Sequence, residues 1–339
     1  MLIATKPRAG MAALLILTAL PGCDNVNWGG ADVQVVPPPP PGGARQIAPD
    51  DQTFADLGLP SGTVIFHVVR GEGGAQVFPV AEVAGDSLRT LRRPAGVSPQ
   101  AYESRFRQAV LEPGAQLALF RRGAPVGTLT LTGTGPATAC GIPTATGTAT
   151  TVAAAADVGE FLAFRKGLEP EVRGEYAPPQ VNGSIRTFAS IVAERLVLQN
   201  GLPRPRSWPG AQRDMQAIEV VQGGNPEMAA TYLVGDQLAV GPAEPNGYSV
   251  FYIAGYETRS GYTPFYQEVR DYRRTGKAAP RFLDYLDWNG VGGTDMLVQV
   301  YGPNESWYEA ISQDRGNRWQ KVWEGPRCRG ESGQGQQQR

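Results

Sequence analysis

The sequence predicts an α+β protein dominated by antiparallel β-sheets, with two or three short helices and a four-stranded, blade-like meander at the C-terminal end. Charged residues make up only 19% of the 339 residues, and the chain contains 43 glycines and 29 prolines. Short apolar, β-branched segments alternate with Gly, Pro, Asn and Asp, which is the pattern of strands joined by tight turns. Helical periodicity is confined to brief segments, so we expect sheets to form most of the core.

The first predicted folded region covers residues 53–175. Residues 63–70 (TVIFHVVR) are apolar and β-branched and predict a buried strand, with residues 76–83 as its hairpin partner. Ser98 followed by Pro99 is typical of a helix start, and apolar residues recur after it at a spacing of four, namely Tyr102, Phe106 and Val110. Further strands are expected at residues 116–120, 126–132 and 160–165. The Thr-, Ala- and Gly-rich stretch 128–151 is expected to be an exposed loop or an excursion at a sheet edge.

The second predicted region covers residues 176–329. A helix is expected over residues 184–199, because four apolar side chains fall on one of its faces, namely Ile185, Phe188, Val192 and Leu196. From residue 216 onward the pattern is that of strands, which we expect at 216–221, 229–233, 250–254 and 263–272. Residues 330–339 are rich in Gly and Gln and are expected to be a disordered tail.

The last part of this region predicts one antiparallel meander of four strands, at residues 281–285, 296–301, 306–312 and 318–323. The connecting segments are short enough to join neighbouring antiparallel strands. In the third of these strands Trp307 and Ile311 alternate with Tyr308 and Ala310, so that both faces carry apolar residues. We therefore expect both faces of this meander to be covered by other parts of the protein.

The N-terminal segment has the three parts of an export signal. Lys6 and Arg8 precede an apolar run of ten residues, 11–20, which is too short to span a bilayer. The run ends at Leu20-Pro21-Gly22-Cys23, which resembles the lipobox of bacterial lipoproteins. The resemblance implies that a signal peptide of residues 1–22 is removed and that Cys23 is acylated. An ordinary secretory signal with a chance cysteine is the alternative.

A lipid on Cys23 would tether the chain to a membrane of the cell envelope, facing the periplasm or the exterior. Residues 23–52 would form the tether, and five consecutive prolines at 37–41 favour an extended, stiff spacer. The predicted partners are therefore the lipid bilayer, through Cys23, and an unknown envelope protein or glycan. The formal net charge is −1 and no polybasic run exists, so we expect no nucleic-acid partner.

An acidic loop near the C-terminus contains Asp284, Asp287, Asn289, Gly290 and Asp295. It resembles the calcium loop of FG-GAP and VCBS-like β-propeller repeats, in which spaced oxygen ligands hold Ca²⁺. The resemblance implies Asp287 and Asn289 as ligands and Asp295 as the terminal acid, while Asp284 lies one residue away from the first ligand position. The alternative is a turn without metal. No other cofactor is expected, because one His and three Cys exclude the common zinc sites.

Nucleophilic catalysis has weak support in the sequence. Residues 85–88 (Gly-Asp-Ser-Leu) match the short signature of GDSL-type esterases, but the sole histidine, His67, precedes them and lies in a predicted buried strand. Because a serine nucleophile needs a base within hydrogen-bonding distance, a turn is the preferred interpretation of these four residues. His67 is expected to be a hydrogen-bonded core residue.

Aromatic and cysteine residues give the remaining candidates. Tyr256, Tyr262 and Trp288 lie beside turn residues, so we expect them to be exposed and available for ligand binding. Cys140 and Cys328 are the cysteines that remain once Cys23 is acylated, and an exported chain meets an oxidising compartment, which predicts a disulfide between them.

These observations favour a membrane-tethered envelope lipoprotein that acts as a non-catalytic binding or scaffolding module. The alternative is an envelope hydrolase that attacks glycans or esters through paired carboxylates, whose spacing in space no sequence pattern reveals. A cleft in which two carboxylates converge would distinguish the two functions.

Overall fold

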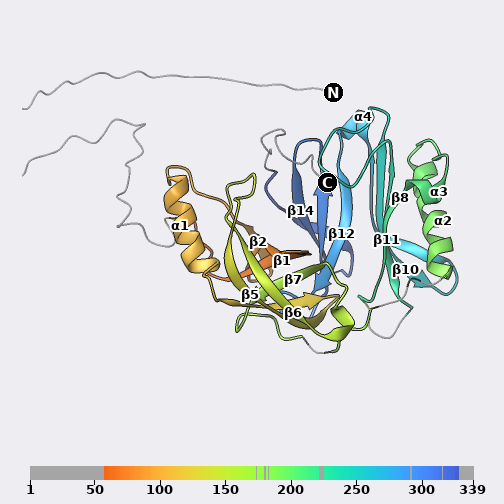
Figure 1. The fold of residues 1–339 in the computed structure, drawn as a ribbon. Coiled ribbons are helices and arrows are strands. Elements are labelled where there is room, and N and C mark those ends of the chain that lie inside the picture. The colour runs from red at the N-terminus through yellow and green to blue at the C-terminus, as the bar shows by residue number, and fades with distance from the viewer. Residues whose placement is uncertain are drawn as a thin grey trace, which may run out of the picture. The chain divides into compact units, whose positions relative to one another are not determined.

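A computed structural model of the protein describes residues 57–172, 174–178, 181, 183–220, 225–290, 292–314 and 316–327. These residues belong to one compact unit that consists of three antiparallel sheets and a few helices, which confirms the predicted fold class (Figure 1). The predicted signal peptide (residues 1–22) and the predicted tail (residues 330–339) lie outside the described residues, as does the predicted tether (residues 23–52). Within the described part, no helix combines the length and the apolar character needed to cross a bilayer.

The first sheet is a closed barrel. Its strands follow the order β1-β7-β4-β5-β6-β2-β3, and β1 also pairs with β2, so that the ring closes and β3 is left outside it. The strands are β1 (Thr63–Gly71), β2 (Gly74–Ala84), β3 (Ser87–Thr90), β4 (Gln116–Arg121), β5 (Ala124–Gly135), β6 (Thr144–Thr151) and β7 (Glu160–Arg165). The predicted hairpin of residues 63–70 and 76–83 is confirmed. Closure pairs the strand edges that an open sheet would leave exposed.

Strand β1 shows how the barrel sorts its side chains. Phe66 and Val68 belong to the core inside the barrel, whereas Ile65 belongs to the core that the barrel shares with the last sheet. His67 follows the same alternation and therefore points outward, away from the barrel interior. The His67 side chain therefore lies between the barrel and the last sheet of the chain.

Helix α1 (Pro99–Val110) packs against the barrel core. The Ser98 hydroxyl accepts a hydrogen bond of 3.1 Å from the Ala101 amide, and Pro99 occupies the first turn, as predicted. Tyr102, Phe106 and Val110 are its buried face and join the barrel core.

The prediction for residues 128–151 was wrong, because most of this stretch lies in β5 and β6, which pair with each other along their length. The glycines of this stretch led to the prediction of a loop, although its alternating threonines favour strands. The glycines have a packing role here. A Cβ on Gly147 would lie 2.5 Å from Leu129 Cδ2 and 2.7 Å from the Thr130 carbonyl oxygen, so the two strands approach too closely for a side chain.

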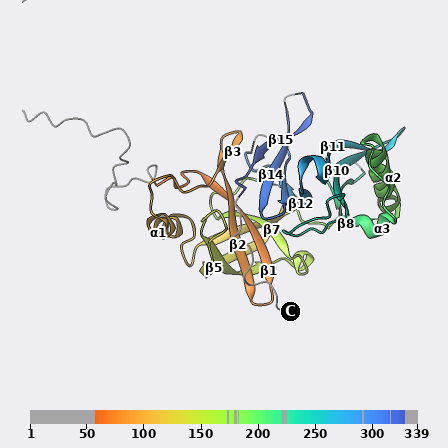
Figure 2. The same ribbon diagram turned by 90° about the horizontal axis from the view of Figure 1, so that it is seen from above.

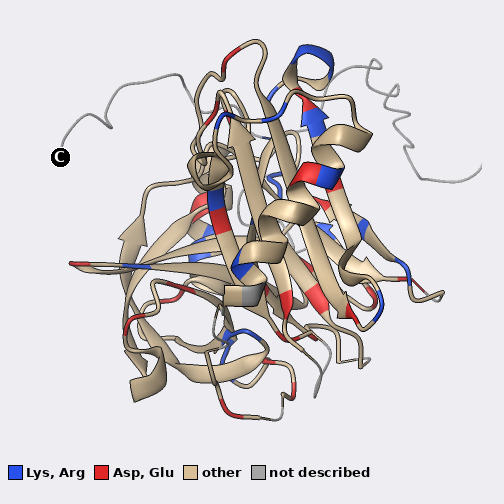
Figure 3. Ribbon diagram, turned by 90° about the vertical axis from the view of Figure 1, so that its right-hand side faces the viewer, with Lys and Arg blue, Asp and Glu red and all other residues tan. Residues whose placement is uncertain are grey.

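The second sheet has the order β11-β10-β9-β8 and is covered on one face by α2 (Figures 1 and 3). Its strands are β8 (Gln212–Ile218), β9 (Glu227–Val234), β10 (Tyr248–Glu257) and β11 (Gly261–Asp271), and its helices are α2 (Gly183–Gln199), α3 (Trp208–Ala211) and α4 (Tyr272–Thr275). The predicted helical face is confirmed, because Ile185, Val192 and Leu196 are buried against this sheet. The Tyr252 hydroxyl fixes the helix by donating a 2.6 Å hydrogen bond to the Ala189 carbonyl oxygen.

The third sheet is the predicted four-stranded meander, in the order β12-β13-β14-β15. Its strands are β12 (Ala279–Leu286), β13 (Asp295–Tyr301), β14 (Ser306–Gln313) and β15 (Trp319–Glu324). Both faces are covered, as predicted. Ala310 and Tyr308 contact the core shared with the barrel, whereas Trp307 and Ile311 belong to the core shared with the second sheet. Figure 2 shows this central position of β12 to β15 from above.

The predicted boundary at Tyr176 separates the sheets along the chain. All barrel strands precede it, and all strands of the second and third sheets follow it. The two regions nevertheless pack as one compact unit, because the third sheet contacts the barrel directly.

Because the third sheet is packed on both faces, we expect Leu297→Ala in β13 to lower the free energy of unfolding by about 2–5 kcal/mol, the usual cost of a cavity in a core. Val322→Ala in β15 is the control, since Val322 is 51% exposed and its truncation should change stability by less than about 0.5 kcal/mol. Urea denaturation of both variants measures the difference. Equal effects would contradict the burial of this sheet against the barrel.

Candidate functional site

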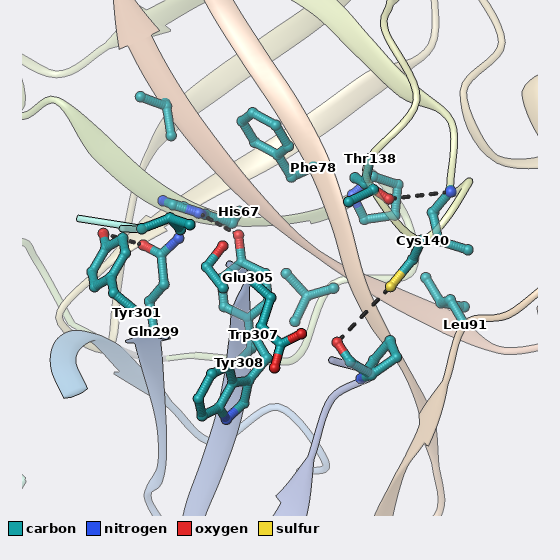
Figure 4. A pocket seen from close by; sticks show the side chains of 18 of the residues that line it. His67, Phe78, Leu91, Thr138, Cys140, Gln299, Tyr301, Glu305, Trp307 and Tyr308 are labelled. Atoms are coloured by element: carbon teal, nitrogen blue, oxygen red, sulfur yellow. Dashed lines mark hydrogen bonds between the residues drawn. The ribbon is translucent and has the colours of Figure 1, made fainter. Parts of the chain in front are cut away.

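A cavity of about 490 Å³ lies between the barrel and the third sheet (Figure 4). We call it the His67 pocket. Strands β1 and β2 form one wall and β13 and β14 the other. Its apolar lining includes Val69, Phe78, Pro79, Val80, Leu91, Ile142, Val240 and Trp307, and its polar lining includes His67, Thr138, Glu160, Gln299, Tyr301, Asn304, Glu305, Ser306 and Tyr308.

His67 is held between two polar side chains. Its Nδ1 lies 2.9 Å from the Tyr308 hydroxyl, and its Nε2 lies 3.7 Å from Glu160 Oε1. The second distance is too long for a hydrogen bond and is an electrostatic contact. The carboxylate favours a proton on Nε2, so we assign the neutral tautomer in which the Tyr308 hydroxyl donates to Nδ1. His67 is therefore the hydrogen-bonded, buried histidine that the sequence predicts.

Glu160 on barrel strand β7 and Arg281 on strand β12 of the third sheet form a two-pronged ion pair between the two sheets. The Arg281 Nη1 and Nη2 atoms lie 2.7 and 2.8 Å from the two Glu160 carboxylate oxygens. The Gln299 side-chain oxygen accepts hydrogen bonds from Arg281, at 3.2 Å, and from the Tyr301 hydroxyl, at 2.8 Å. This network fixes the polar wall of the pocket in one arrangement.

The pKa shifts in this wall follow from burial and from the ion pair. Burial lowers the pKa of His67, and the nearby Glu160 only partly opposes this, so the imidazole is neutral at pH 7. Burial would raise the pKa of Glu160, but Arg281 and His67 outweigh it and lower the pKa, so this carboxylate is ionised. Burial raises the pKa of Tyr308, so its hydroxyl stays protonated.

The three side chains are arranged in the order of a nucleophilic triad. The Tyr308 hydroxyl contacts the His67 imidazole, and the imidazole contacts the Glu160 carboxylate. The hydroxyl is phenolic, however, and its raised pKa opposes formation of the nucleophilic anion. The arrangement is therefore suited to presenting a fixed polar surface to a ligand.

The acidic loop separates into two parts. Asp284 is buried, and its Oδ1 accepts hydrogen bonds from the backbone N–H of Arg122, at 2.7 Å, and of Tyr285, at 2.9 Å. Its Oδ2 lies 3.3 Å from Arg121 Nη1. Burial raises the pKa of Asp284, although Arg121 opposes the rise. Asp284 thus binds the third sheet to barrel strand β4 and does not turn toward the loop.

Asp287 and Asp295 are neighbours in the loop itself. Asp287 accepts 2.8 Å hydrogen bonds from the amides of Gly290 and Gly292, and Gly290 has a φ of +71°, as a sharp turn requires. Asp295 contacts the Ser312 hydroxyl through Oδ1, and its buried Oδ2 has no hydrogen-bond partner among the described residues. Burial, with a contribution from the charge of Asp287, raises the pKa of Asp295 to about 6.

Within the described part of the chain, no group of three or more His, Cys, Asp or Glu side chains is arranged to hold a metal. Asn289 lies in the same loop, between Asp287 and Gly290. Calcium binding by Asp287, Asn289 and Asp295 stays a prediction.

The expected exposure of the three aromatic candidates holds for one of them. Tyr256 is 44% exposed, but Tyr262 and Trp288 are only 4% and 6% exposed, so for these two the expectation was wrong. Tyr262 packs against Phe188 of α2, and Trp288 packs in the core between the barrel and the third sheet. Adjacent turn residues do not expose a side chain when a helix or a second sheet covers the strand end. None of the three lines the His67 pocket.

Cys140 is disulfide-bonded and lines the pocket at the end opposite His67 (Figure 4). Its Sγ lies 3.9 Å from the carbonyl oxygen of Pro326, and because a disulfide sulfur carries no proton, this is a close contact and not a hydrogen bond. Pro326 precedes Cys328 by two residues. Cys23 and Cys328 lie outside the described residues, so the pairing of Cys140 with Cys328 stays a prediction.

The Gly-Asp-Ser-Leu segment is partly a turn, because Gly85 and Asp86 form the turn between β2 and β3 whereas Ser87 and Leu88 belong to β3. Ser87 begins β3, and its hydroxyl donates a 3.1 Å hydrogen bond to the Ala84 carbonyl oxygen. Ser87 is not among the residues that line the His67 pocket.

Comparison of the chain with protein-family models, with curated proteins and with solved structures found no match.

We expect Asp295→Asn to stabilise the protein at neutral pH. The pKa of Asp295 is about 6 in the folded protein and 3.8 for an ordinary carboxyl group, so between these pH values the folded protein binds a proton that the unfolded chain has released. The stability of the wild-type protein therefore falls as the pH rises through this range, and the loss is complete above pH 6. The variant should gain roughly 1–3 kcal/mol at pH 7.5 with chelator present, and nothing at pH 3.5. Urea denaturation at both pH values measures this.

Repeating the measurement with excess Ca²⁺ provides the control, because bound metal would stabilise the wild-type protein and not the variant. A variant that is less stable than the wild type at pH 7.5 with chelator would show that the ionised Asp295 carboxylate stabilises the fold.

Proposed function

We propose that this protein is a lipid-anchored envelope protein whose folded body is a non-catalytic binding module, and that the His67 pocket is its binding site. The observation that carries the proposal is the pocket itself. It has the size of a small-ligand site and combines apolar and aromatic side chains with polar ones, and hydrogen bonds hold His67 and Glu160 at fixed positions.

The state of the polar groups supports binding over catalysis. Glu160 has both oxygens engaged by Arg281, and His67 is neutral and bonded to Tyr308. A catalytic acid or base needs a pKa near the working pH, whereas the pKa of Glu160 is lowered away from neutrality. These groups can orient a ligand without exchanging protons with it.

The alternative, a glycan or ester hydrolase with paired carboxylates, has one supporting observation, since Glu160 and Glu305 both line the pocket. A glycosidase requires one of its two carboxyl groups to be protonated at the working pH. The ion pair with Arg281 keeps Glu160 ionised, which argues against its role as the general acid.

The proposed anchor rests on the N-terminal sequence alone. Lys6, Arg8, the apolar run and Cys23 are in the register of a lipoprotein signal, and the proline run at 37–41 would hold the folded body away from the membrane surface.

Cys23→Ala should move the protein from the membrane fraction to the soluble fraction, because the acylated thiol would be lost. Fractionation of expressing cells followed by immunoblotting measures the distribution. Cys328→Ser is the matched cysteine control and should remain with the membrane. Retention of the Cys23→Ala variant in the membrane pellet would require a different anchor.

Val69→Trp should weaken binding of N-phenyl-1-naphthylamine, an uncharged apolar fluorophore, by at least about tenfold, because the indole would fill the half-buried wall position. Val322→Trp, at an exposed site outside the pocket, should bind like the wild type. Fluorescence titration measures the affinity, and thermal unfolding shows whether both variants fold.

Phe78→Ala gives a second test by enlarging the pocket and removing an aromatic contact, which should also weaken binding. Unchanged affinity in both pocket variants would place the probe elsewhere and overturn the proposed site.

A further inference from the structure

A second opening adjoins the His67 pocket at its Cys140 end. A groove of about 350 Å³ shares four lining residues with the pocket, namely Leu91, Ala139, Cys140 and Pro326. Its remaining lining residues are Arg92 and Arg93. Two consecutive arginines therefore lie in a groove that borders the Cys140 end of the pocket.

These two arginines carry positive charge that the neighbouring chain does not neutralise. Both are exposed, and neither forms an ion pair with any acid in the described part of the chain. Arg93 Nη1 donates a hydrogen bond to the Val97 carbonyl oxygen, which holds its guanidinium in place and leaves its other N–H groups available. Arg89 differs, because its Nη1 lies 3.3 Å from the Glu82 carboxylate.

The charges of the combined space are separated along its length. Glu160, which is paired with Arg281, lies 3.7 Å from His67, whereas Leu91 and Cys140 mark the opposite end of the pocket (Figure 4). Arg92 and Arg93 follow Leu91 at that opposite end. Between the two ends the lining is largely apolar, with Phe78, Val80 and Ile142.

We infer that the ligand is an amphipathic anion, whose apolar body occupies the His67 pocket and whose carboxylate, phosphate or sulfonate lies on Arg92 and Arg93. This inference rests on the proposed function of the pocket. Guanidinium groups bind such oxyanions in a two-pronged geometry, whereas the guanidinium of Arg281, near His67, is already paired with Glu160. The apolar body accounts for the lining between the two ends.

Two fluorophores that share one apolar body test the inference. N-Phenyl-1-naphthylamine is uncharged, and 8-anilinonaphthalene-1-sulfonate adds a sulfonate to the same skeleton. The wild-type protein should bind the sulfonate probe more tightly, and the preference should shrink as salt rises. An Arg92→Gln/Arg93→Gln double variant should bind the sulfonate about tenfold more weakly and the uncharged probe with unchanged affinity.

Arg105→Gln is the matched control, because Arg105 is an exposed arginine on α1 outside both openings. The single variant Arg92→Gln keeps the Arg93 contact to Val97 and should still weaken sulfonate binding, so the test does not depend on a loop that the double variant might disturb. Thermal unfolding of each variant monitors the fold.

Competition identifies the head group. Dodecanoate or dodecyl phosphate, used below the concentration at which it forms micelles, should displace the sulfonate probe from the wild type, and dodecanol should compete poorly. Displacement by either anion supports the inference and names the head group. Equal displacement by dodecanol would overturn it.

The failures of the two proposals are distinguishable. If the uncharged probe binds and Val69→Trp abolishes its binding, while the arginine variants leave the sulfonate affinity unchanged, the pocket is a binding site and the anionic ligand is wrong. If the uncharged probe fails to bind, the proposed function fails and the anionic ligand with it.

Discussion

The third sheet is apolar on both faces, and the packing of the molecule follows from this. A two-faced apolar sheet cannot meet water on either side, so it must lie between two other layers. Leu297 and Ala310 contact the outside of the barrel, while Met296 and Val298 contact the second sheet. The two regions of the chain therefore form one compact unit, although their strands pair only within their own sheets.

Polar side chains fix how the barrel and the third sheet fit together. Apolar contact is non-directional and tolerates sliding, whereas ion pairs and hydrogen bonds require one alignment. Arg281 reaches Glu160 on β7, and Arg121 on β4 reaches both Asp284 and the Leu283 carbonyl oxygen, the latter at 2.7 Å. Removing one member of either ion pair would leave a charge unpaired in a partly buried or fully buried position, so these contacts define the alignment. The position of His67 against Tyr308, and with it the polar wall of the pocket, depends on this alignment.

The sequence predicted local elements well and distant contacts poorly. The meander, the helix starting after Ser98 and the hairpin of β1 and β2 follow from periodicity and turn residues, which are local properties. Barrel closure is not local, since it depends on β7 pairing with both β1 and β4. Glu160 and Arg281 are 121 positions apart, and nothing near either residue identifies its partner. The buried positions of Tyr262 and Trp288 were missed for the same reason, because distant elements cover them.

The ionisation of the polar wall links the pocket to the stability of the fold. The pKa of His67 is lowered in the folded protein, so as the pH falls below the ordinary value of 6.5 the unfolded chain binds a proton at this residue before the folded protein does. Glu160 has a lowered pKa as well, and its contribution is lost as the pH falls below its ordinary value of 4.5. Both effects therefore oppose folding in acid and leave the wall in a single charge state at neutral pH. A wall whose charges are already paired does not compete for a ligand's charge, and the head group is left to the unpaired arginines at the other end.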